Sequence, residues 1–313
     1  MRLLAIKISA IALGGLFFFL TLEAGLRFLP YNSGLVAAQV DDNQPVYRFL
    51  ADRDVRYSQD WDMKNSRIRH INKDGFLSDI EYIAEDDGPL MAVIGDSFVE
   101  AIQVDWKASV HGLLYQSLAP DVRVYAFAAA YASLAQYLAW SAYAREAYEP
   151  DMLVVNVVGN DFLQILPKPG ETFSGGFMGM NFFAEDKDGG LIVRRSDRLP
   201  ESWLIRLARQ SAIIDYAHRN VNITSAPGRI KALFRNLTGP QKEPLYIANT
   251  LAEVDDDQLA LSKREVDMFL ELLPSMSGLA PQSIVITIDG LRPELYEPTL
   301  LAMAEDSFPA TMA

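Results

Sequence analysis

The sequence predicts a parallel α/β fold, in which helices cover both faces of a sheet. Short apolar runs bounded by turn residues, at 89–95 and 151–159, have the length and composition of strands buried on both faces. Helical periodicity fills the segments between them, and strands that alternate with helices form parallel sheets through right-handed crossovers. The 313 residues, 50% of them hydrophobic, suit one sizeable globular domain with accessories.

The first segment, residues 1–29, is expected to anchor the chain in a membrane. Arg2 and Lys7 precede residues 8–22, which carry no charge. Spanning a bilayer takes about 20 apolar residues, so this run is at the short end unless residues 24–29 contribute. A signal peptide fits the same pattern, but no small-x-small cleavage motif is evident, which favours an uncleaved anchor. Basic residues before the span place the N-terminus in the cytoplasm and the bulk of the chain outside.

The rest of the chain divides into a polar connection and the main domain. Residues 30–88 carry many turn signals and are predicted to be irregular. Residues 166–200 show neither helical nor strand periodicity and are either an ordered insertion near the site or a surface loop. Ser262 and Glu265 form a capping-box pattern, which predicts a helix start there. The expected strands are 90–95, 122–127, 152–158 and 283–289, and the expected helices include 108–118 and 131–148.

Composition excludes several classes of function. The net charge is -13 and the pI is near 4.7, so the chain lacks the basic surface that a nucleic-acid-binding protein needs. The absence of cysteine removes disulfides, thiolate catalysis and cysteine metal sites. No cluster of histidine and carboxylate residues stands at metal-ligand spacing, so we expect neither a metal nor a cofactor.

Two predicted strand ends carry small polar residues. Gly95-Asp96-Ser97 follows the first strand, and Gly159-Asn160-Asp161 follows the third. The carboxyl ends of parallel strands meet at one edge of the sheet, so these tripeptides should lie close together. Acyl transfer by a serine needs a base and hydrogen-bond donors for the oxyanion, and an asparagine amide is such a donor.

The pair of motifs "VIGDSFVEA" and "VVGNDF" resembles the SGNH, or GDSL-type, hydrolases. "INKDGF" and "YASLAQYL" are similar to a membrane-anchored bacterial branch, and the resemblance covers roughly residues 70 to 313. It implies a flavodoxin-like three-layer α/β/α sandwich and an inner-membrane protein whose domain faces the periplasm or exterior. It also implies ester hydrolysis, with Ser97 as nucleophile and backbone oxyanion donor, Asn160 as a second donor, and Gly159 and Asp96 in the same site.

The sequence departs from this family at two places. Tyr131 stands near the position of a family glycine whose amide completes the oxyanion hole. The family's C-terminal Asp-x-x-His is absent, and the three histidines, His70, His111 and His218, are expected to be packing or surface residues. Asp96 is expected to hold its turn, and Asp161 to be structural.

These observations leave three hypotheses. The first is a serine esterase that acts on acyl groups, such as acetyl, of an extracytoplasmic carbohydrate or small ester, with a hydrolase-like domain at 89–313 that is incomplete at its C-terminus and lacks the base. The second is a non-catalytic scaffold that holds a glycan or a partner in a degenerate cleft. The third is a gene fragment, because a sheet without its last strand leaves an exposed edge.

Overall fold

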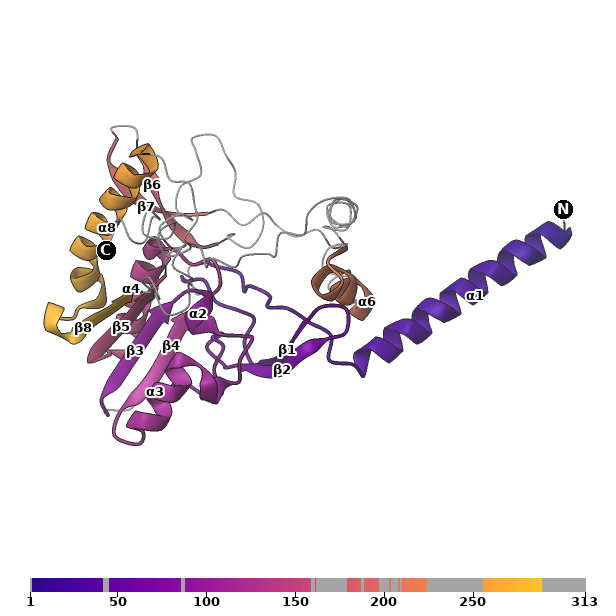
Figure 1. Ribbon diagram of the computed structural model, residues 1–313, viewed down its shortest axis with the longest axis horizontal. Coiled ribbons are helices and arrows are strands. Elements are labelled where there is room, and N and C mark those ends of the chain that lie inside the picture. Colours follow the sequence, from indigo (N-terminus) through magenta and orange to yellow (C-terminus); the bar gives the residue numbers. More distant parts are fainter. Residues whose placement is uncertain are drawn as a thin grey trace, which may run out of the picture. The chain divides into compact units, whose positions relative to one another are not determined.

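The chain forms two compact units in the computed structural model, and each is described by itself. Unit 1 comprises Met1–Val36, Asp54–Arg69 and Pro200–Gln241, and unit 2 comprises Ala37–Arg53, His70–Leu199 and Lys242–Ala313. The structure describes residues 2–41, 45–85, 88–158, 161, 179–186, 189–196, 203, 208, 210–223 and 256–288. Figure 1 shows the elements coloured along the chain.

Unit 2 is built on a four-stranded parallel sheet (Figure 1). The sequence prediction of one parallel sheet is confirmed, and no strand boundary differs from its expected position by more than one residue. The spatial order is β4-β3-β5-β8, and the strands are β3 (Leu90–Gly95), β4 (Arg123–Ala128), β5 (Met152–Val157) and β8 (Ile284–Ile288).

The strand order creates a switch point between β3 and β5. Counted along the chain, the order is second, first, third, fourth, as in flavodoxin-like doubly wound sheets. The chain leaves β3 toward β4 on one side and then returns to β5 on the other. In open parallel sheets, ligands bind outside the carboxyl ends of the strands at such a point.

Helices cover both faces of this sheet. On one face, Val93 and Val124 pack with Leu114 of α3 (Val110–Leu118). On the other, Phe127 contacts Tyr143 of α4 (Leu134–Tyr148), and α8 (Asp256–Ser277) packs along α4. Consecutive residues of a strand point to opposite faces, so strands that are apolar throughout fill both layers of the core.

The edge strand β4 is completed by a side chain. The buried hydroxyl of Tyr82 donates to the Ala126 carbonyl oxygen at 2.7 Å and accepts from the Ala126 N–H at 2.9 Å. It thereby satisfies both polar groups of one residue that would otherwise face a missing strand.

The structure contains strand pairs and shorter helices that the sequence analysis did not anticipate. Residues 30–88 include a two-stranded sheet, β1 (Arg53–Gln59) and β2 (Lys64–Ile71), where we expected irregular structure. The segment 166–200 includes the antiparallel pair β6 (Asn181–Glu185) and β7 (Leu191–Arg195). The shorter helices are α2 (Ser97–Glu100), η1 (Trp106–Ala108), α6 (Ala212–Asp215), η3 (Tyr216–Asn220) and η5 (Pro281–Ser283).

The predicted capping box at Ser262 and Glu265 is wrong. The helix α8 begins at Asp256, so both residues lie in its interior, and both are buried. The motif failed because capping needs a helix end, and the residues before Ser262 continue the helix instead.

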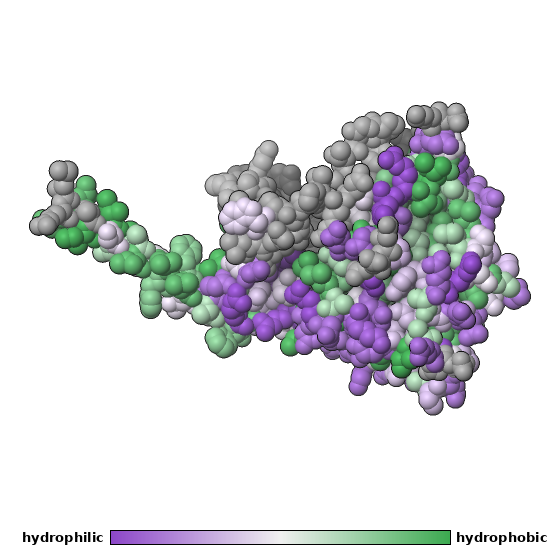
Figure 2. Space-filling view, turned by 180° about the vertical axis from the view of Figure 1, so that it is seen from behind, coloured by the Kyte–Doolittle hydropathy of each residue, from purple (hydrophilic) through white to green (hydrophobic). Residues whose placement is uncertain are grey.

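Unit 1 includes the N-terminal helix α1 (Arg2–Arg27). From Ile6 to Arg27 this helix is long and apolar enough to cross a membrane, although a signal sequence passes the same test of length and composition. Figure 2 shows hydrophobic residues along its length.

Candidate active site

Ser97 is the first residue of α2, which follows β3 directly. Gly95 makes this junction possible, because a Cβ at residue 95 would clash with the side chain of Val99. The helix therefore folds back closely against the end of β3. Ser97 is half-buried at the carboxyl edge of the sheet, while Asp96 before it is fully buried.

Asp96 caps α2 and holds Ser97. Its Oδ1 accepts a hydrogen bond from the Phe98 N–H at 2.9 Å, and its Oδ2 accepts from the Ser97 hydroxyl at 3.2 Å. The N–H of Ser97 itself donates to no group in the part of the chain that the structure describes. The first N–H groups of a helix have no partner within it, so this donor is available to an oxygen of a bound ligand.

Asp161 occupies the corresponding place after β5. Its Oδ2 accepts from the Val158 N–H and from the Tyr137 hydroxyl of α4, each at 2.9 Å, and its own N–H donates to the Val158 carbonyl oxygen at 2.9 Å. The side chain thus ties together the two ends of residues 158–161. We infer that Asp161 is a structural residue, as the sequence analysis expected.

Burial shifts the pKa values of both Asp161 and Tyr137. Burial raises the pKa of Asp161 well above its usual value, and the negative charge of Asp96 raises it further. Burial likewise raises the pKa of Tyr137, and the nearby Asp161 and Asp96 add to this effect. Tyr137 therefore keeps its proton and acts as the donor.

The segment after β4 is tied to α2. The buried Glu100 accepts a hydrogen bond from the Ala130 N–H at 2.7 Å through its Oε2. The next residue, Tyr131, is 54% exposed and has a φ of 68°, a left-handed conformation that is an outlier for a bulky residue and favours glycine. The backbone at residue 131 thus has a conformation that glycine adopts more readily than tyrosine.

The sheet register brings these three segments to one edge. Gly95 of β3 pairs with Ala128 of β4, and Ile94 of β3 pairs with Val155 of β5. Ser97, Tyr131 and Asp161 each stand a few residues beyond these pairs. Their segments therefore share the carboxyl edge, and β3 and β5 flank its switch point.

The structure describes two of the four expected site residues. Ser97 and Asp96 lie at the carboxyl edge of the sheet as expected, whereas Gly159 and Asn160 lie outside the described residues.

The three histidines lie in other surroundings. The buried His111 bonds to Ser109 through Nε2 at 3.2 Å, and His70 is 3.6 Å from the Glu81 carboxylate. His218 belongs to unit 1. Within the described residues, the Ser97 hydroxyl has Asp96 as its hydrogen-bond partner and contacts no histidine.

Two residues that support the site were missed by the sequence analysis. Tyr137 lies near the N-terminal end of α4 with no local mark of its role. Glu100 could have been noticed, because an acid between Val99 and Ala101 so close to Ser97 is unusual in an apolar stretch. Its partner, 30 residues away, could not have been found from local pattern.

Fold and site together define a parallel α/β protein with an accessible serine at the switch point of its sheet. No protein-family model and no curated protein match the chain. Solved structures similar to part of it include TesA, with 28% identity over 24% of this chain, and AlinE4, an SGNH-hydrolase family esterase, with 19% identity over 25%. The chain covers 43% and 44% of those structures, and each TM-score is 0.23.

Proposed function

We propose that the edge between β3 and β5 hydrolyses esters through Ser97. The observation that carries this proposal is the position of Ser97, which is half-buried at the switch point and has its hydroxyl held by Asp96 and its N–H unengaged within the described residues. A nucleophile and an oxyanion donor on one residue are the two groups that acyl transfer needs first.

The chemistry proceeds through an acyl-enzyme. Ser97 Oγ attacks the ester carbonyl carbon, and a base takes the hydroxyl proton. The oxyanion that forms accepts hydrogen bonds from the Ser97 N–H and from the Asn160 side chain. Collapse of the tetrahedral intermediate expels the alcohol, and water then hydrolyses the acyl-serine. Asp96 positions the hydroxyl, and Asp161 with Tyr137 anchors the end of the segment that carries Asn160.

The base is the weak point of this mechanism in the described part of the chain. Asp96 accepts from the Ser97 hydroxyl, but its other oxygen is engaged by the Phe98 N–H. Within the described residues the Ser97 hydroxyl contacts no histidine, the side chain that most often serves as the general base. We therefore expect slow turnover by this chain unless a base is supplied.

The substrate and location follow the sequence resemblance. We propose acyl esters, such as acetyl esters, of an extracytoplasmic carbohydrate, because the motifs around Ser97 and Asn160 resemble a membrane-anchored bacterial branch of SGNH hydrolases. The helix α1 would hold the protein in the inner membrane as a single-pass anchor, with unit 2 facing the periplasm or exterior.

The test compares the chain with Ser97→Ala on an aryl acetate, with and without added imidazole. Imidazole supplies the base, so the Ser97-dependent rate, taken as the difference between the two proteins, should rise with imidazole. A fluorophosphonate probe should label Ser97, as shown by peptide mass spectrometry. Equal rates for the two proteins in both conditions, together with no adduct on Ser97, would exclude the esterase proposal.

A binding scaffold is the second candidate, and Tyr131 is the observation that favours it. Its exposed ring at the same edge offers a flat apolar face to a sugar, and its side chain stands where the resembled family has glycine. If this function is the right one, Ser97→Ala binds an acetylated oligosaccharide as tightly as the parent chain does, and Tyr131→Ala loses binding in titration calorimetry.

A further inference from the structure

Two exposed aromatic side chains lie close to Ser97 in the chain and in the fold. Phe98 is 46% exposed and Tyr131 is 54% exposed. Every other aromatic side chain of unit 2 that the structure describes is buried or half-buried. The two exposed rings belong to the segments directly after β3 and β4, at the edge where ligands bind in an open parallel sheet.

The helical turn of α2 sets the direction of Phe98 relative to Ser97. Two backbone hydrogen bonds close this turn, each at 2.9 Å. Successive side chains of a helix are rotated by about 100° around its axis. Val99 is fully buried and faces Gly95 at the end of β3, so Ser97 faces away from the sheet. Phe98 and Glu100 then stand on opposite sides of Ser97.

Tyr131 lies on the Glu100 side of this turn. Glu100 Oε2 accepts a hydrogen bond from the Ala130 N–H at 2.7 Å, which holds the segment after β4 against that side of α2. Tyr131 is the next residue of the segment. Ser97 therefore has an exposed aromatic residue on each side, with Tyr131 toward β4 and Phe98 away from it.

The backbone of Tyr131 gives a second, independent reason to expect a ligand here. Its φ of 68° is unfavourable for a bulky residue, and its ring is half exposed, so burial in the core does not compensate for the strain. Strained residues of this kind concentrate at ligand-binding and active sites. A tyrosine at this position is explained by what its ring contacts outside the protein.

The openness of both rings points to one chemical class of ligand. A long acyl chain gains affinity when an apolar pocket encloses it. Phe98 and Tyr131 instead present ring surface to solvent. A pyranose ring has a flat face of C–H groups that packs on such a surface while its hydroxyls stay in water. One sugar unit at Ser97 cannot cover both rings, because they lie on opposite sides of it.

We propose that Phe98 and Tyr131 bind the sugar units on either side of the unit that carries the ester, so that the ligand is an acylated oligosaccharide or polysaccharide chain lying across Ser97. This inference rests on the proposed binding of an acylated carbohydrate at this edge. It applies both to an esterase and to a binding scaffold, because it concerns how the chain is held.

The test measures binding by the full chain with Ser97→Ala, which prevents turnover through Ser97. O-acetylated xylose and mannose are titrated by calorimetry as single sugars, dimers and tetramers. We expect affinity to rise with length. Phe98→Ala and Tyr131→Ala should each weaken binding of a tetramer about 2- to 10-fold. Phe98→Tyr and Tyr131→Phe keep a ring and should restore binding. Leu113→Ala, at an exposed position of α3, is the matched control and should have no effect.

The outcomes separate this inference from the esterase proposal. The inference is overturned if no tetramer binds, if affinity does not rise with length, or if both alanine variants bind tetramers as tightly as the Ser97→Ala chain does. Unfolding in urea shows whether each variant keeps its fold. Hydrolysis of an aryl acetate is measured separately on the chain with Ser97 intact. Ser97-dependent hydrolysis can therefore be found when this inference fails, and length-dependent binding can be found without any hydrolysis.

Discussion

The Tyr137 hydroxyl donates a hydrogen bond to Asp161 Oδ2 at 2.9 Å in the interior of unit 2, where both residues are fully buried. This bond joins the helix α4 to the end of β5. It leaves Asp161 Oδ1 without a partner among the described residues, so the Asp161 carboxyl has few groups to replace a lost donor. The hydrogen bond between the Asp161 side chain and α4 therefore depends on one phenol.

Replacing Tyr137 by phenylalanine should destabilise unit 2. The change leaves a buried carboxyl short of a donor, which costs about 1–3 kcal/mol. Tyr115→Phe on α3 is the matched control, because the Tyr115 hydroxyl makes no hydrogen bond within the described residues, and its effect should stay within about 0.5 kcal/mol. The measurement is the free energy of unfolding in urea. Equal stabilities for the two variants would show that the Tyr137 bond contributes nothing.

The Tyr131→Gly variant should be more stable than the Tyr131→Ala variant. At most positions alanine is favoured, but a residue with a Cβ in the left-handed conformation costs about 1–2 kcal/mol that glycine avoids. Tyr131→Gly and Tyr131→Ala lose the same ring, so their difference isolates the backbone. We expect Tyr131→Gly to unfold at higher temperature than Tyr131→Ala. The reverse order would mean that the left-handed φ carries no strain.

Gly95→Ala should destabilise the junction between β3 and α2, and a smaller neighbour should restore it. The new Cβ would clash with Val99, and such overpacking costs about 1–3 kcal/mol. The Val99→Ala background removes the nearest clashing atom, Val99 Cγ2, and leaves tighter than usual contacts with the Cβ of residue 99 and the Asn156 carbonyl oxygen, so Gly95→Ala should cost less there but not nothing. Thermal unfolding of the four proteins gives the coupling. If the effects of the two substitutions on stability were purely additive, the new Cβ at residue 95 would not be clashing with Val99.

The buried Glu265 should make stability fall with rising pH. Burial raises its pKa from 4.5 to about 8 in the folded protein. The unfolded chain therefore loses this proton first, and stability is lost between pH 4.5 and about 8, by an amount on the order of 5 kcal/mol. Glu265→Gln should remove this dependence and be more stable than the parent chain at neutral pH.

The matched control for Glu265 is Glu271→Gln, an exposed position on the same helix. Unfolding in urea at several pH values compares the three proteins. A Glu271→Gln profile parallel to that of the parent chain is expected. If Glu265→Gln were also parallel to the parent chain, the buried carboxyl would not be the source of the pH dependence.

Local sequence pattern was sufficient to locate the strands of the parallel sheet and to place Asp96 and Ser97 at the end of one of them. Continuous apolar runs located the four strands of the parallel sheet, because strands buried on both faces leave an unbroken run. The position of Ser97 followed from the end of one such run. Hairpins with mixed polarity, such as β6 and β7, carried no comparable signal, because β7 is largely exposed and its pattern is not apolar.

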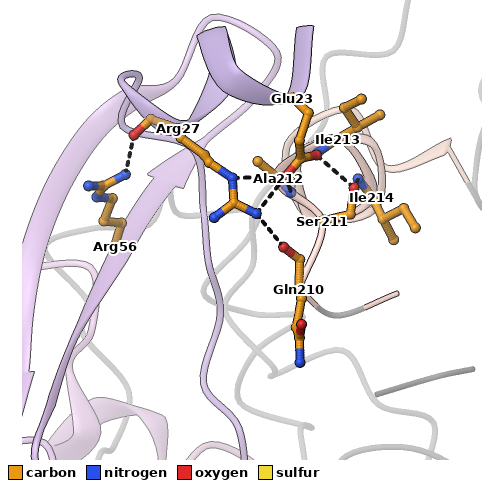
Figure 3. A network of polar contacts seen from close by, with 8 residues as sticks. All are labelled: Glu23, Arg27, Arg56, Gln210, Ser211, Ala212, Ile213 and Ile214. Atoms are coloured by element: carbon orange, nitrogen blue, oxygen red, sulfur yellow. Dashed lines mark hydrogen bonds and ion pairs between the residues drawn. The ribbon is translucent and has the colours of Figure 1, made fainter. Parts of the chain in front are cut away.

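The sequence by itself determined where the strands and the nucleophile candidate lie along the chain, because periodicity and turn residues are local properties. Only the tertiary structure decided which strands are neighbours, and hence that the segments after β3 and β5 share a switch point. It also decided which acids are buried, since Glu265 lies in a polar stretch whose sequence gives no sign of its burial. The contact between Glu23 and Ser211 (Figure 3) spans 188 residues, and no local pattern reports a partner at that distance.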